Sequence, residues 1–188
     1  IFHWGGEGNI TLIGDLLNLP IDLVAVLAAV YVLTRKDLDK RFRRMWLLLG
    51  LGFLAYFIGD LIWAYMENVL EVTPFPSVSD VFYLLFAPLL AAGLISMPNT
   101  FLNRQERLQF AFDLLITMII TTMLMWYFVI QPTAASYAGD LLTQAIAIAY
   151  PISDMIVVGA IVSALLRKPD QDLRSVLWLL ILSMFFTV

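Results

Sequence analysis

The chain has 188 residues, of which 61% are hydrophobic and only 14% charged, with a formal net charge of −4 and a mean hydropathy of +0.88. Soluble globular domains are about 45–50% apolar and about 25% charged. The composition therefore argues against a soluble enzyme, a disordered tail or a nucleic-acid-binding protein. It predicts an all-α integral membrane domain that occupies residues 1–188.

Cysteine and histidine usage narrows the chemistry further. The chain contains no Cys and a single His, His3. Disulfides, thiolate metal sites and cysteine nucleophiles are therefore excluded, as are metal or haem sites that need several histidines from one chain. We expect no catalytic residue and no metal site, and the sequence leaves the cofactor unknown.

Apolar runs predict the helices. A membrane-spanning helix needs about 20 mostly apolar residues. A sixth apolar run begins near Ser175 and stops at Val188, too early to cross, so six helices are expected, the last incomplete. The chain starts at Ile1 without a signal peptide, which we interpret as an internal fragment of a longer protein. The five complete runs are 12–34, 45–66, 80–98, 108–131 and 139–166.

The basic residues predict the orientation. All 11 Lys and Arg lie in three segments, 35–44, 104–107 and 167–174. The connections 67–79 and 131–139 between them hold none. Short loops rich in Lys and Arg stay in the cytoplasm. We therefore expect a multi-pass protein with its N-terminus outside.

An internal repeat relates residues 20–56 to residues 152–188. At this offset Asp22 aligns with Asp154, Arg35-Lys36 with Arg167-Lys168, and Trp46 with Trp178. Chance similarity between two apolar hairpins is the alternative. A true repeat predicts a further helix after residue 188, similar to 80–98, giving seven helices and a cytoplasmic C-terminus.

Polar residues inside the predicted helices form one-sided series in their outer halves. Intramembrane ionisable groups are costly and are functional candidates, and each such face must turn from lipid, so we expect the faces to converge on one outward-opening cavity. The predicted lining of this cavity is Asp22, Asp60, Trp63, Ser79, Asp80, Tyr83, Tyr150, Ser153 and Asp154.

No basic residue accompanies these acids. Each carboxyl is therefore protonated, hydrogen-bonded, or a ligand for a cation or amine. A structural alternative treats Pro20 with Asp22, Pro151 with Asp154, and Ser77 with Asp80 as helix starts, where Pro and acids are favoured. For Asp154 this alternative needs a broken helix that faces protein or a wet cavity.

Two stretches resemble a known family. They are GDLIWAY at 59–65, followed by PFPSVSDVFYL at 74–84, and YPISD at 150–154. They resemble the N-terminal multi-helix membrane regions of bacterial signalling proteins that end in diguanylate cyclase (GGDEF), EAL phosphodiesterase or kinase modules. The resemblance implies a sensor domain in the bacterial inner (cytoplasmic) membrane, in cyclic-di-GMP signalling, with the catalytic output outside these residues. It does not imply a ligand.

Several functions remain open at this point. The leading hypothesis is a sensor whose outward-facing acidic cavity biases a cytoplasmic output. The alternatives are a lysoplasmalogenase-like hydrolase using Gly59-Asp60, a transporter coupled to protons or cations, and a structural subunit of a membrane complex. Expected partners are the lipid bilayer and a small-molecule or cationic ligand from the outer side. A homodimer stays open, and no nucleic acid is expected.

The orientation can be tested by thiol labelling of intact cells. Asp37 lies in a connection rich in basic residues and Ser136 in one that has none. Asp37→Cys should therefore resist a membrane-impermeant maleimide, whereas Ser136→Cys should react. Labelling of Asp37→Cys with protection of Ser136→Cys would reverse the orientation.

Overall fold

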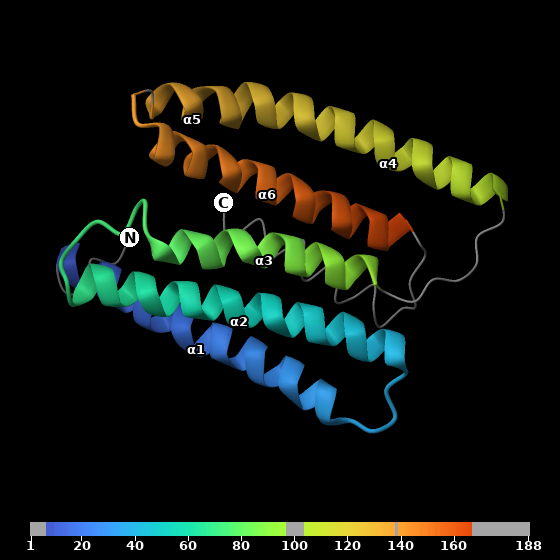
Figure 1. Cartoon of the computed structure of the whole chain (residues 1–188), viewed down its shortest axis with the longest axis horizontal. Coiled ribbons are helices and arrows are strands. Elements are labelled where there is room, and N and C mark those ends of the chain that lie inside the picture. Colours follow the sequence, from blue (N-terminus) through green and yellow to red (C-terminus); the bar gives the residue numbers. More distant parts are fainter. Residues whose placement is uncertain (1–6, 97–103, 138, 167–188) are drawn as a thin grey trace.

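The computed structural model of the chain describes residues 7–96, 104–137 and 139–166, and every regular element in these ranges is helical. The all-α prediction is thus confirmed for them. A π-helical turn, η1, continues α4 directly into the short α5. The elements, shown in Figure 1, are α1 (Glu7–Thr34), α2 (Lys40–Asn68), α3 (Val78–Ile95), α4 (Arg104–Met125), η1 (Trp126–Ile130), α5 (Gln131–Ser136) and α6 (Leu141–Leu166).

Four helical segments in the described ranges are long and apolar enough to cross a membrane. The predicted run 108–131 extends to Ser136, because η1 and α5 prolong α4. A shorter apolar stretch covers Asn18–Thr34 in α1. Residues 167–188 lie outside the described residues, so the sixth helix and the repeat of 20–56 in 152–188 stay predictions. The four segments are Lys40–Asn68, Val78–Ile95, Leu108–Ser136 and Leu141–Leu165.

The long helices pack in a row, in the order α1, α2, α3, α6, α4 (Figure 1). Within the described residues, each long helix packs only against its neighbours in this row. Figure 1 shows α1, α3 and α6 running in one direction and α2 and α4 in the other. Helix α6 therefore separates α3 from α4, although α4 follows α3 in the sequence.

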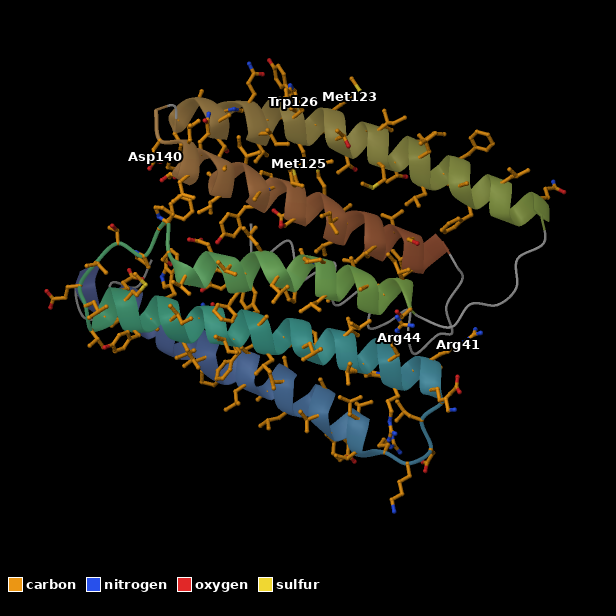
Figure 2. The ribbon with its side chains drawn as sticks, viewed as in Figure 1. Arg41, Arg44, Met123, Met125, Trp126 and Asp140 are labelled. Atoms are coloured by element: carbon orange, nitrogen blue, oxygen red, sulfur yellow. The ribbon has the colours of Figure 1, made fainter. Side chains whose placement is uncertain are left out.

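The two ends of the row differ in charge. The loop 35–39, the start of α2 and the start of α4 lie at one end, which we call the basic end (Figure 1). The α2–α3 connection 69–77 and the start of α6 lie at the other, which we call the acidic end. Figure 2 labels Arg41 and Arg44 at the basic end and Asp140 at the acidic end.

The apolar core joins α2, α3 and α6 in the half of the row nearer the basic end. Apart from Met45, its buried residues are small or branched, which lets the helices interlock closely. Leu90 and Ala164 are among the most deeply buried, at 2% and 1% exposure. The buried members are Met45, Leu49, Ala87, Leu90, Ala91, Leu94, Val157, Ala160, Ile161 and Ala164.

Helices α2 and α3 are tightly packed at Gly59. A Cβ atom added there would lie 2.7 Å from Cε1 of Tyr83. The Tyr83 ring cannot simply turn away, because its hydroxyl is hydrogen-bonded to Asp60 at 2.7 Å. About two helical turns nearer the basic end, the same substitution at Gly52 would meet Phe86 and Leu89 only at ordinary contact distances of 3.5 Å.

Gly59→Ala should therefore destabilise the protein by about 1–3 kcal/mol, the usual range for overpacking a tight interface. Gly52→Ala is the matched control and should change the free energy of unfolding much less. Both values can be measured by reversible unfolding in mixed detergent micelles. Equal effects for the two variants would contradict the close approach of Tyr83 to Gly59.

Candidate functional site

Polar side chains occupy the half of the row nearer the acidic end, away from the apolar core. On α2 the core residues Met45 and Leu49 precede Tyr56 and Asp60, and on α3 the order is reversed, with Asp80 preceding Leu90. This reversal follows from the opposite directions of the two helices. The polar groups of α2, α3 and α6 therefore share one layer.

The Asp80 carboxylate is fixed at the start of α3 by two hydrogen-bond donors. Its Oδ2 accepts a hydrogen bond from the Ser77 backbone N–H at 2.6 Å, while the Ser77 hydroxyl accepts from the Ser79 N–H at 3.2 Å. Oδ1 of Asp80 accepts a hydrogen bond from the hydroxyl of Tyr150 on α6. Asp80 is only 1% exposed and Ser79 is fully buried. The interpretation of Ser77 and Asp80 as a helix start is confirmed, as a capping box.

Phe75 strengthens this junction from the α2–α3 connection. Its ring lies 6.4 Å from that of Tyr150 and 5.8 Å from that of Tyr137, centroid to centroid. Pro74 beside it is buried. The segment 74–80 thus connects the start of α3 to α6 and to the residue that follows α5. The predicted candidates Ser79, Asp80 and Tyr150 all belong to this structural junction.

Asp60 and Tyr83 form a second contact, between α2 and α3. The Tyr83 hydroxyl donates to Asp60 Oδ1 at 2.7 Å. Aromatic rings surround the pair: Tyr56 lies 5.1 Å and Trp63 6.3 Å from Tyr83. The Trp63 indole N–H donates to Glu67 Oε2 at 2.7 Å, so the indole nitrogen is turned toward Glu67, four residues further along α2. Asp60 is thus held in an aromatic setting.

Asp22 brings α1 to the same place. Its carboxyl lies close enough to that of Asp60 for the two groups to interact electrostatically. Asp22 Oδ2 is nevertheless buried without a hydrogen-bond partner in the described part of the chain. Two adjoining carboxyls cannot both be ionised cheaply without a proton or a cation between them. Asp22 therefore places an unpartnered carboxyl oxygen inside the row.

Tyr56 links these acids to α6. Its phenol lies within electrostatic range of the carboxyls of Asp60, Asp22 and Asp154. Asp154 is half-buried on α6. The acids of α1, α2 and α6 therefore approach a common phenol at mid-length of the row. We call Asp22, Tyr56, Asp60 and Asp154 the acidic cluster.

The alternative interpretation of Asp22 and Asp154 as helix starts is wrong. Helix α1 runs through Pro20, and α6 runs through Pro151 without a break. A proline removes only one backbone donor and disturbs one turn, and packed neighbouring helices tolerate this in membrane proteins. Neither acid caps a helix terminus, so each is an acid within a continuous helix.

Ser153 is the last of the predicted cavity residues, whereas Tyr56 and Phe75 contribute contacts at the site without having been predicted. Ser153 is half-buried on α6. Tyr56 was not among the predicted cavity residues, although its spacing of four from Asp60 places both on one helical face. Phe75 had no sequence signal for its aromatic contacts beyond the unusual Pro-Phe-Pro run.

Asp140, at the acidic end, caps the first turn of α6. Its carboxylate accepts from the Thr143 hydroxyl and from the backbone N–H groups of Thr143 and Leu142. These bonds, that of the Thr143 hydroxyl first, hold the pKa of Asp140 below its usual value. Asp140 is exposed and does not belong to the acidic cluster.

Metal binding is not indicated in the described ranges, where no three His, Cys, Asp or Glu side chains are grouped to hold an ion. Comparison with protein-family models, with curated proteins and with solved structures gave no match to this chain. The assignment of function therefore depends on the arrangement of the chain's own residues.

The junction at Asp80 can be tested with two matched tyrosines. Tyr150→Phe keeps the ring against Phe75 but leaves Asp80 Oδ1 buried without its donor, so it should destabilise the protein by about 1–3 kcal/mol. Tyr137→Phe also keeps its ring against Phe75, and Tyr137 is 39% exposed, so stability should hardly change. Thermal unfolding in detergent compares them. Equal stabilities would contradict the Tyr150–Asp80 bond.

Proposed function

We propose that the chain is a multi-pass sensory domain of a bacterial cytoplasmic membrane, with its N-terminus outside, which binds a cation or protonated amine at the acidic cluster. Occupancy of the cluster alters the packing of α1 and α6 against α2 and α3. The change passes to a cytoplasmic output domain beyond this sequence. The four helical segments able to cross a membrane support the placement.

One observation supports cation binding most directly. Carboxyls from α1, α2 and α6 approach Tyr56, while every Lys and Arg of the chain lies in 35–44, 104–107 or 167–174. Within the described residues, α1, α2 beyond Arg44, α3 and α6 therefore carry no basic residue that could neutralise the acids. A cation would satisfy the buried, unpartnered Asp22 Oδ2. The rings of Tyr56, Tyr83 and Trp63 favour an organic cation through their π faces.

The position of the cluster suits transmission of a signal. Asp22 is on α1, at one end of the row's order, and Asp154 is on α6, beyond α3. A ligand bridging them acts on helices that do not pack against each other within the described residues. It can therefore shift the row as a whole, provided that it binds one arrangement better than the other.

The alternatives receive less support. A hydrolase would need two carboxyls free to activate water, but Tyr83 occupies Oδ1 of Asp60. A transporter site is often built on broken helices, whereas α6 runs without a break through Pro151. The adjoining carboxyls of Asp22 and Asp60 keep the hydrolase as a testable second hypothesis.

The proposal predicts saturable cation binding that depends on the cluster. The purified chain in nanodiscs is titrated with tetramethylammonium chloride, with sodium chloride as a matched salt, and tryptophan fluorescence is followed. Asp22→Asn and Asp154→Asn should each weaken tetramethylammonium binding tenfold or more, a loss of about 1.4 kcal/mol. Asp113→Asn is the control, because Asp113 is exposed on α4.

In the complete protein, the same variants should abolish the response of its output to the ligand while the protein stays folded. Unchanged binding in both variants, with only a change of melting temperature, would assign the acids to a structural role. Release of aldehyde from a vinyl-ether lysolipid, lost in Asp60→Asn, would instead favour the hydrolase.

A further inference from the structure

The basic end carries a concentrated, unneutralised positive charge. Six Lys and Arg side chains and only two acids, Asp37 and Asp39, lie within residues 35–44. All six basic side chains are exposed. Asp39 is engaged at the start of α2, where its Oδ1 accepts from the Lys40 backbone N–H at 2.8 Å. The structure contains no ion pair among the described residues, so these positive charges remain available to an outside partner.

The charges differ in where they lie on α2. Arg44 lies four residues after Lys40 and three residues after Arg41, so the three basic side chains share one face of the first turns of the helix. The Arg43 guanidinium is turned toward α1, where Nη2 donates to the Leu33 carbonyl oxygen at 3.5 Å. Figure 2 labels Arg41 and Arg44 beside the start of α2, at the basic end.

The face that carries Arg44 continues into an exposed apolar stripe. Leu47, Leu51 and Leu54 follow Arg44 at three, seven and ten residues, which keeps them on its side of the helix. Their side chains are 48%, 45% and 39% exposed. A positive cluster at the helix end, followed by a leucine stripe, matches a phospholipid in shape and chemistry, with the phosphate on the arginines and an acyl chain along the leucines.

We propose that Lys40, Arg41, Arg44 and the stripe Leu47, Leu51 and Leu54 form a binding site for one acidic phospholipid on the cytoplasmic side. The inference rests on the membrane placement proposed above, but not on cation binding at the acidic cluster. The leucine stripe favours a lipid over free phosphate, because inorganic phosphate has no apolar part that could pack against exposed leucines. The site would tie the α1–α2 hairpin to the acidic lipids of the inner leaflet.

The test uses the purified, delipidated chain in detergent, titrated with phosphatidylglycerol or with phosphatidylcholine of the same acyl chains and followed by native mass spectrometry. Phosphatidylglycerol should bind more tightly. Arg44→Gln should weaken it about fivefold, the effect of one basic residue at a lipid surface. Arg43→Gln removes the same charge from the same turn but faces α1, so it should weaken binding less than twofold. Circular dichroism verifies that both variants are folded.

Two further arms separate the sources of binding. Inorganic phosphate at the same ionic strength as a sodium chloride control should displace no more lipid than the chloride does, and Leu51→Ser should weaken phosphatidylglycerol binding. Equal losses for Arg43→Gln and Arg44→Gln, or displacement by phosphate alone, would overturn a defined lipid site. Tetramethylammonium binding, measured separately in the same preparations, reports on the acidic cluster, so failure of one proposal is distinguishable from failure of the other.

Discussion

The structure depends on how carboxyl groups inside apolar helices are satisfied without basic partners. A carboxyl in such surroundings is costly unless a hydrogen-bond donor, another carboxyl or a cation compensates it. Asp80 obtains its donors from its own helix start and from Tyr150, and Asp60 obtains one from Tyr83. Each solution connects two helices, so the contacts that satisfy the acids also order the row at its acidic end.

The row is stabilised differently at its two ends. Near the basic end, small and branched residues of α2, α3 and α6 interlock in an apolar core. Near the acidic end, hydrogen bonds and aromatic contacts replace much of that packing. Dispersion contacts are not directional, whereas hydrogen bonds are, so a polar layer can switch between discrete arrangements while the apolar half stays packed. This division suits a domain that binds at one level and transmits to another.

The sequence predicted the structure best where the signal lies within one helix or at its start. The apolar runs predicted each described long helix, and the spacing of Ser77 and Asp80 predicted the cap of α3. The predicted runs 12–34 and 139–166 pass through Pro20 and Pro151 as α1 and α6 do, and only the alternative that placed helix starts at these prolines was wrong. A proline marks a helix start only when neighbouring helices do not support the continued turn. The row order and the pairs Tyr83–Asp60 and Tyr150–Asp80 depend on tertiary packing, which spacing within one helix cannot reveal.

The segment 74–80 carries much of the resemblance to signalling membrane domains, and its side chains are used for structure. Ser77 and Asp80 cap α3, Asp80 also bonds to Tyr150, and Phe75 packs on α6. A run of this kind therefore indicates how the acidic end is built, and it places no constraint on the ligand. The less satisfied groups, Asp22 and Asp154, lie outside that segment, on α1 and α6. If the proposed sensory role holds, ligand specificity would be set by α1 and α6, while the α3 junction would keep its structural role.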